Sequence, residues 1–248
     1  MPELAEQLEK LRGIIAQSHS IVFFGGAGVS TESGVPDFRS KDGLYNQHDV
    51  RFDMYQPEYL LSHTCLAREP KVFYEFYRQK MDARFAQPNA AHYALAKLER
   101  EGKLKAIVTQ NIDGLHQRAG SKEVYEIHGT TMRNYCMKCG KSFPADYIYE
   151  SKEPVPRCGC GGMVRCDVTL YEEQLPEEAV QKSIRAISQA DTLIIGGTSL
   201  TVYPAASYVR FFSGEHLVVI NKDPLAVRLN AEKDLQINAP IGEVLSQI

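Results

Sequence analysis

Apolar residues recur along the chain with two spacings, and together they predict a sheet covered by helices. Short continuous apolar runs predict buried strands at Ile21–Gly25, Leu104–Gln110, Val124–His128, Asp191–Gly196 and His216–Asn221. Apolar residues at helical spacing predict helices at Met1–Gln17, Asn89–Arg100, Pro176–Ala190 and Pro204–Phe212. Strands that alternate with helices favour an α/β fold with a doubly wound, parallel, Rossmann-like sheet.

Two stretches interrupt this alternation. Residues 40–84 contain two predicted helices, which begin near Pro57 and Pro70, and residues 133–164 contain four cysteines among Gly, Pro and Lys. We interpret both stretches as insertions that together form a smaller domain, built from a helical insertion and a zinc ribbon. The larger, Rossmann-like domain then consists of residues 1–39, 85–132 and 165–248.

The four clustered cysteines form two close pairs, Cys136–Cys139 and Cys158–Cys160, separated by eighteen residues. Four thiolates suit a tetrahedral Zn²⁺ ion, and a site filled by four protein ligands has no open position for catalysis. The single-residue spacer of the second pair leaves Cys166 as an alternative fourth ligand. We do not expect this segment to bind nucleic acid, because the formal net charge of the chain is −3.

Composition adds limits on the partners and the location. The chain has 248 residues and a formal net charge of −3, so it has no overall attraction to nucleic acid or anionic membranes. Residues 1–17 alternate charged side chains with Leu and Ile, unlike a secretion signal. A tight cysteine cluster is also more typical of metal binding in the cytosol than of disulfides. We therefore expect a cytoplasmic protein that does not bind membranes.

A glycine-rich loop follows the first predicted strand, with the sequence GAGVSTESGVPDFR at residues 26–39. Glycines here let the backbone approach a pyrophosphate, whose charge suits the amides presented there. A simple dinucleotide fingerprint would have Gly in place of Thr31 and would lead directly into a helix. A dehydrogenase would also place an acidic residue after a second strand, about twenty residues later. Instead, Phe38 and Arg39 indicate chemistry near the ribose of a nucleotide.

Further polar residues follow the other predicted strands, where ligands of such sheets bind. The side chains of Gln110–Asp113 can bind ribose hydroxyls and a carboxamide, although such a turn could instead cap the next helix. His128 can take a proton near neutral pH. His116 is the competing histidine, and its place in a helical turn favours a structural role. The loop Gly196–Pro204 and Asn221 offer further groups to phosphate or ribose.

These ordered motifs resemble those of the sirtuins, which are NAD-dependent protein deacylases, and the resemblance spans Ile21 to about Leu235. It implies NAD as cofactor, one structural zinc ion, and acylated-lysine proteins as substrates. In the implied reaction, the acyl-lysine oxygen attacks the ribose carbon as nicotinamide leaves. Water finally releases the free lysine and O-acyl-ADP-ribose.

The resemblance also implies individual roles. His128 would be the general base, Asn111 and Asp113 would support nicotinamide cleavage, and Phe38 would shield the reacting carbon while Arg39 holds the cofactor. The implied cofactor-binding residues are Gly26, Ala27, Gly28, Thr31, Phe38, Arg39, Gln110, Asn111, Ile112, Asp113, His128, Gly197, Thr198, Ser199, Asn221, Asp234 and Leu235. The implied zinc ligands are Cys136, Cys139, Cys158 and Cys160.

One segment departs from the family pattern. The usual substrate strand reads close to VVxFGE, whereas Val168–Glu173 reads VTLYEE, and Cys166 stands where proline is usual. Glu172 replaces a glycine and could alter peptide docking. Two other functions are kept as alternatives: an enzyme that mainly transfers ADP-ribose or hydrolyses NAD, and a non-catalytic zinc-ribbon binding module.

The expected acyl group follows from a second comparison with the family. Sirtuins that prefer succinyl or malonyl lysine resemble one another in a Tyr-x-x-Arg pair on a helix of the small domain. The matching positions here are Tyr74 and Tyr77, and Arg78 lies one residue further on. A buried carboxylate without a guanidinium partner carries a large desolvation cost. We therefore expect acetyl or another uncharged acyl group to be preferred.

Overall fold

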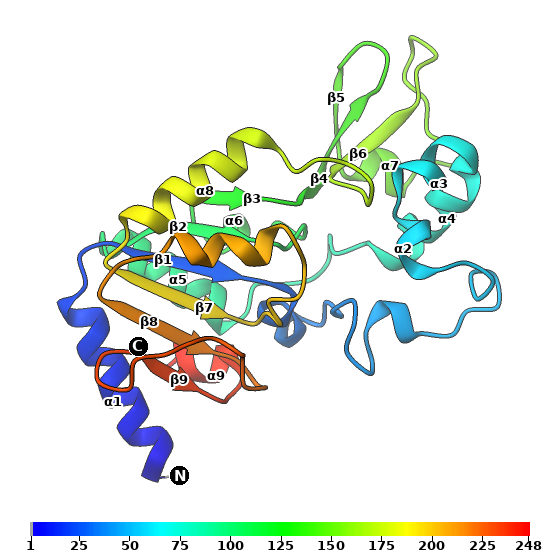
Figure 1. The fold of residues 1–248 in the computed structure, drawn as a ribbon. Coiled ribbons are helices and arrows are strands. Elements are labelled where there is room, and N and C mark those ends of the chain that lie inside the picture. The colour runs from blue at the N-terminus through cyan, green and yellow to red at the C-terminus, as the bar shows by residue number, and fades with distance from the viewer. Residues whose placement is uncertain (1) are drawn as a thin grey trace.

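The computed structural model describes residues 2–248, and its centre is a six-stranded parallel sheet. The strand order is β3-β2-β1-β7-β8-β9. The strands are β1 (Ile21–Gly25), β2 (Leu104–Thr109), β3 (Val124–Glu126), β7 (Thr192–Gly196), β8 (His216–Ile220) and β9 (Leu235–Ile237). The strand order reverses between β1 and β7, which confirms the doubly wound α/β fold and places a ligand crevice there (Figure 1).

Helices cover both faces of this sheet. One face carries α1 (Pro2–Gln17), α5 (Ala90–Arg100) and α9 (Ile241–Leu245), and the other carries α8 (Glu177–Gln189) and the 3₁₀ segment η4 (Ala205–Phe211). Along β1, Ile21 and Phe23 pack on the first side and Val22 and Phe24 on the second. Burial on both sides explains why the strands read as continuous apolar runs.

A second, antiparallel sheet lies at one end of the first (Figure 1). Its order is β5-β4-β6. Its elements and the neighbouring helices are β4 (Gly129–Cys136), β5 (Ser142–Pro144), β6 (Val164–Val168), α2 (Pro57–Leu60), α3 (His63–Arg68), α4 (Pro70–Lys80) and α7 (Asp146–Tyr149). One hydrophobic cluster joins the two inserted stretches and includes Phe73, Tyr77, Ile148 and Val164.

The element boundaries differ from the predictions in small ways. The strands at Leu104 and Val124 end before Gln110 and His128, so these polar residues lie in loops beyond the sheet. The segment after Pro204 is a 3₁₀ helix rather than an α-helix. Neither α3 nor β9 was predicted, because six and three residues are too few to display a clear period.

The remaining short elements are α6 (Leu115–Arg118), η1 (Ala27–Val29), η2 (Thr31–Ser33) and η3 (Leu44–Asn46). Met1, the first residue of the predicted N-terminal helix, lies outside the described residues. Among the helices of residues 2–248, none combines the length and apolar character that a membrane crossing requires.

Candidate active site

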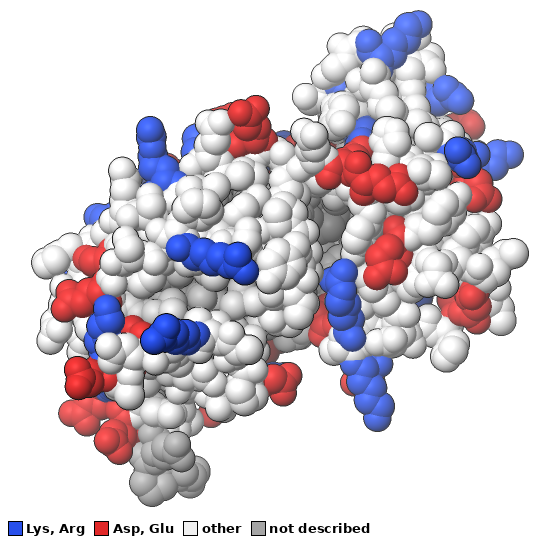
Figure 2. Space-filling view, in the orientation of Figure 1, with Lys and Arg blue, Asp and Glu red and all other residues white. Residues whose placement is uncertain are grey.

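A cavity of about 1510 Å³ lies beyond the carboxyl ends of the parallel strands. Loops that follow β1, β2, β3, β7 and β8 line one part of it, and residues of α4 and of the segment after β6 line another. Figure 2 shows the molecule hollowed between these two parts. The site therefore occupies the crevice that the reversal of strand order predicts.

The glycine loops after β1 and β7 contact each other directly. The Gly28 amide donates to the Gly197 carbonyl at 2.8 Å, and a Cβ on Gly28 would lie 2.9 Å from the Gly197 backbone. Gly197 itself has φ +57°, a conformation that favours glycine. On the far side of this contact, the Thr198 amide donates to Asn221 Oδ1 at 3.1 Å. Only glycines allow this approach, which brings the two predicted nucleotide loops together.

Two anchors outside the cavity hold the loop after β1. Glu32 Oε2 accepts a hydrogen bond from the Gly242 amide at 2.7 Å, at the start of α9. Asn89 Nδ2 donates to the Val29 carbonyl at 2.7 Å, while Asn89 Oδ1 caps α5 by accepting from the Ala91 amide. The loop is therefore positioned by helices on the same face of the sheet.

His128 lines the cavity directly beyond β3. Its Nδ1 lies 2.9 Å from the Gln110 carbonyl oxygen. Because a carbonyl can only accept, Nδ1 carries the proton and Nε2 keeps its lone pair. Burial lowers the pKa of His128, and the hydrogen bond to Gln110 partly opposes that shift. The imidazole is therefore neutral near pH 7 and can act as a base through Nε2.

A buried relay connects Asn111, Ser30 and Asp113. Ser30 Oγ donates its one proton to Asp113 Oδ2 at 2.7 Å, so it accepts from Asn111 Nδ2 at 3.0 Å. This fixes the amide orientation of Asn111, which lines the cavity and keeps its carbonyl oxygen for another donor. Asp113 does not line the cavity itself and is connected to Asn111 through Ser30. Its Oδ1 also caps α6 by accepting a hydrogen bond from the Leu115 amide. Burial raises the pKa of Asp113.

Most of the predicted cofactor residues meet at the cavity. Those that line it are Gly26, Ala27, Gly28, Thr31, Phe38, Arg39, Gln110, Asn111, Ile112, His128, Gly197, Thr198, Ser199 and Asn221. The structure places Asp234 and Leu235 elsewhere. Asp234 Oδ1 accepts from the Leu217 amide at 2.8 Å, and Leu235 begins the edge strand β9.

Sequence reasoning missed two groups at this site. Ser30 was overlooked although it lies two residues after Gly28, inside the loop that was singled out. Residues 222–225 also line the cavity and were not named from the sequence. Their position directly after Asn221, at the end of a strand, was the available signal.

The segment with the unusual sequence is held by polar contacts. The hydroxyl of Tyr171, where phenylalanine is usual, accepts from Arg39 Nη2 and lies 2.9 Å from the hydroxyl of Tyr45. Glu172 has φ +75°, which costs a non-glycine residue on the order of 1 kcal/mol. Its carboxylate in return accepts from the amide and the hydroxyl of Thr64 at 2.9 and 2.6 Å. Glu172 therefore ties the loop to α3, and the Tyr171 hydroxyl ties it to Arg39 and Tyr45.

His116, the competing histidine, belongs to a buried pair rather than to the cavity. His92 and His116 are 0% and 1% exposed, and their ring centroids are 4.7 Å apart. Within residues 2–248, neither ring nitrogen of His116 has a hydrogen-bond partner. Burial lowers the pKa of His92 to about 4 and that of His116 to about 3. The structure therefore supports a structural role for His116.

Because the pKa values of both buried histidines are lowered, we expect the fold to lose stability as the pH falls. In the unfolded chain each histidine has its ordinary pKa of about 6.5, so the unfolded state binds more protons as the pH falls below that value. Between pH 7 and pH 5 we expect a loss of about 2 kcal/mol for each histidine. Urea unfolding at both pH values measures it. His116→Gln should remove about half of the pair's contribution, and an unchanged pH dependence in that variant would contradict the prediction.

The four clustered cysteines converge at the end of the second sheet. Their Sγ atoms all lie within 4.8 Å of one another, with 3.5 Å between Cys136 and Cys160 and 3.8 Å between Cys139 and Cys158. Four thiolates at about 2.3 Å from a tetrahedral zinc ion would be about 3.8 Å apart, so the geometry fits. Cys166, the alternative ligand, is fully buried and is not among the four converging sulfurs. The donor set therefore fits a structural zinc site.

Comparison with known proteins agrees with this geometry. The Sir2 family model matches residues 26–204. Relatives named NAD-dependent protein deacetylase include those of Clostridium acetobutylicum, 56% identical with 99% of each chain covered, and Clostridium perfringens, 53% identical with 98% of each covered. A solved Sir2 structure described as containing a deacetylated p53 peptide and 3'-O-acetyl ADP-ribose has a TM-score of 0.84. It is 33% identical and covers 98% of this chain and 96% of that one.

Proposed function

The chain belongs to the Sir2 family, and we propose that it is an NAD-dependent protein-lysine deacylase in which His128 is the general base. It releases free lysine, nicotinamide and O-acyl-ADP-ribose. The observation that carries the assignment of the base is the contact of His128 Nδ1 with the Gln110 carbonyl at 2.9 Å. It leaves Nε2 of a neutral imidazole as the proton acceptor in the cavity.

The other residues hold the reactants in place. When bound, NAD supplies a ribose carbon that takes up the acyl oxygen as nicotinamide leaves. The amides of the loops after β1 and β7 suit the negative charge of its phosphates. Asn111, oriented by Ser30 and Asp113, offers its carbonyl oxygen to a donor such as the carboxamide of nicotinamide. Arg39, held by Tyr171, places a positive charge at the same cavity.

Product analysis tests this function. Incubation with NAD and a panel of acylated peptides should give deacylated peptide and O-acyl-ADP-ribose in equal amounts, measured by mass spectrometry. ADP-ribosylated protein or free ADP-ribose as the main product would favour the transferase or hydrolase alternative. Absence of any NAD turnover would favour a binding module.

The cavity predicts a preference for uncharged acyl groups. Leu61, Tyr77 and Met81 give it an apolar wall. Arg78 is directed elsewhere, because its guanidinium donates to the Ile148 and Glu153 carbonyls at 2.9 and 2.7 Å. We therefore expect kcat/KM for an acetyl peptide to exceed that for the matched succinyl peptide by at least about 10-fold, the scale of one unpaired buried charge-assisted contact. Faster removal of succinyl would contradict this.

Two further parts of the proposal concern organisation and location. The division into a large domain (1–39, 85–132 and 165–248) and a small domain (40–84 and 133–164) is supported by the hydrophobic cluster that joins the two inserted stretches. That cluster also contains Cys166 and Leu170, and β6 belongs to the small sheet, so the boundary after residue 164 falls inside β6. A cytoplasmic location is supported by the four clustered thiols, which are too far apart to be disulfides and suit a reducing compartment.

A further inference from the structure

The short helix α7 supports one wall of the cavity from outside. Tyr77 on α4 and Met81 directly after it line the cavity. Tyr149, the last residue of α7, stacks on the ring of Tyr77 with centroids 5.4 Å apart and an angle of 17° between the planes. The Tyr149 hydroxyl also donates to the Met81 carbonyl at 2.8 Å. One side chain of the cysteine-bearing insertion therefore holds two residues of the cavity wall.

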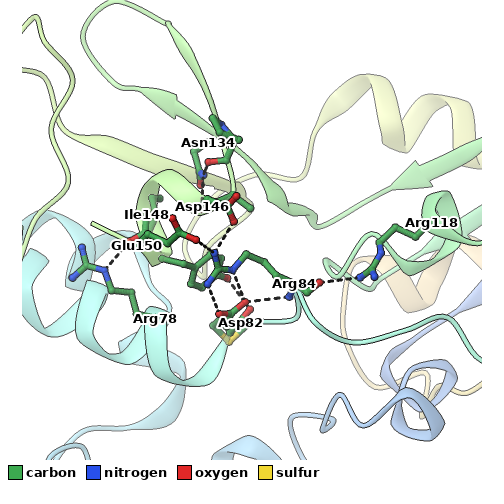
Figure 3. A network of polar contacts seen from close by, with 12 residues as sticks. Arg78, Asp82, Arg84, Arg118, Asn134, Asp146, Ile148 and Glu150 are labelled. Carbon is green, nitrogen blue, oxygen red and sulfur yellow. Dashed lines mark hydrogen bonds and ion pairs between the residues drawn. The ribbon is translucent and has the colours of Figure 1, made fainter. Parts of the chain in front are cut away.

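Arg84 in turn fixes α7. Figure 3 shows its guanidinium between the carboxylates of Asp82 and Asp146, at 2.9 and 2.6 Å. The guanidinium carbon lies 4.6 Å from the centroid of the Tyr149 ring. The Arg84 carbonyl accepts from Arg118 Nη1 at 3.2 Å, which connects the network to α6. This network joins the helical insertion, the cysteine-bearing insertion and α6.

The network is suited to holding a fixed geometry. The Arg84 side chain is only 14% exposed, so its positive charge is stabilised by the surrounding carboxylates rather than by water. Arg78 adds a second link between the two insertions, from α4 to the Ile148 carbonyl of α7. Because α4 is bound to α7 at several points, Tyr77 and Met81 cannot shift without breaking these contacts.

We propose that Tyr149 is a positioning residue for the acyl group. By fixing Tyr77 and Met81 it sets the shape of the apolar wall, and through that wall the acyl chain that fits. The inference rests on the proposed deacylase function. A longer acyl chain buries more apolar surface against this wall, so its binding depends more strongly on the wall's position.

The test is Tyr149→Phe, which keeps the stacked ring and removes only the hydrogen bond to Met81. We expect KM for a butyryl-lysine peptide to rise roughly five-fold, the scale of one net hydrogen bond, with a smaller rise for the acetyl peptide. KM for NAD should stay unchanged. The matched control is Tyr147→Phe on the same helix, where the lost bond goes to the Arg157 carbonyl at 2.7 Å. All three KM values should stay unchanged there.

A second variant, Asp146→Asn, tests the hold of Arg84 on α7. Asp146 is 62% exposed, so the fold should tolerate the change. We expect KM for the butyryl peptide to rise roughly two-fold, KM for the acetyl peptide to rise less, and KM for NAD to stay unchanged. Unchanged KM for both acyl peptides in Tyr149→Phe would overturn the inference, as would an equal rise in KM for NAD. If the unaltered protein turned over no acylated peptide, the proposed function itself would fail, and the inference with it.

Discussion

His128→Ala should lower deacylation by roughly 100-fold or more, the usual scale for loss of a positioned general base. Within residues 2–248 the ring makes one hydrogen bond, to the Gln110 carbonyl, and it borders the cavity rather than filling the core. The thermal transition and the zinc content should therefore be nearly unchanged. Single-turnover rates with NAD and an acetyl peptide, beside calorimetry of the same preparation, measure both effects.

The pH profile separates this role from a structural one. The base acts when neutral, and because burial lowers the pKa of His128, activity should fall only as the pH drops below the ordinary histidine value of about 6.5. The residual activity of His128→Ala should lack that acidic limb. His116→Ala is the contrasting variant. Because the ring of His116 is buried, this variant should lower the free energy of unfolding, and any loss of turnover should follow from that loss of stability. Near-normal turnover in folded His128→Ala protein would rule the mechanism out.

Cys158→Ser should release zinc and unfold the cysteine-bearing segment. A structural zinc site contributes on the order of 10 kcal/mol to folding in favourable cases, which exceeds the whole stability of many domains. Four thiolates leave the ion no position for substrate, so zinc takes no direct part in the reaction. Activity should therefore fall only because the segment unfolds. Elemental analysis and calorimetry measure the two effects.

Cys166→Ser is the matched control for the metal site. Cys166 is buried beside Phe73 and Tyr77 in one hydrophobic cluster, and its sulfur is not among the four that converge. The variant should lose some stability by burying a hydroxyl but should keep one zinc per chain. Full zinc content in folded Cys158→Ser protein, or active wild-type protein without zinc, would show that the assignment is wrong.

The sequence predicted the cavity residues well wherever they follow a strand. Parallel strands end at one edge, so residues after β1, β2, β3, β7 and β8 had to meet there once the alternation was recognised. His128 and Gly197 were found in this way. Asp234 was expected at the cofactor only because its segment resembles a family loop. In the structure it lies outside the cavity lining, directly before the three-residue strand β9, and accepts from the Leu217 amide.

Contacts between distant segments could not be predicted from local patterns. Ser30 and Asp113 are separated by 83 residues, and nothing in either neighbourhood indicates that their side chains hydrogen-bond. Tyr149 and Met81 are similarly distant, at 68 residues. Such pairs depend on how two insertions pack, which is a property of the assembled core rather than of hydrophobic periodicity.

The bond between Glu32 and the Gly242 amide has a consequence for biosynthesis. The two residues are 210 positions apart, so the loop after β1 lacks this hydrogen bond until α9 has been synthesised and has packed. During translation the loop after β1 leaves the ribosome long before its partner is made. A nascent chain that stops short of α9 should therefore bind nucleotide weakly, and the capacity to bind NAD should arise only once these late residues have emerged.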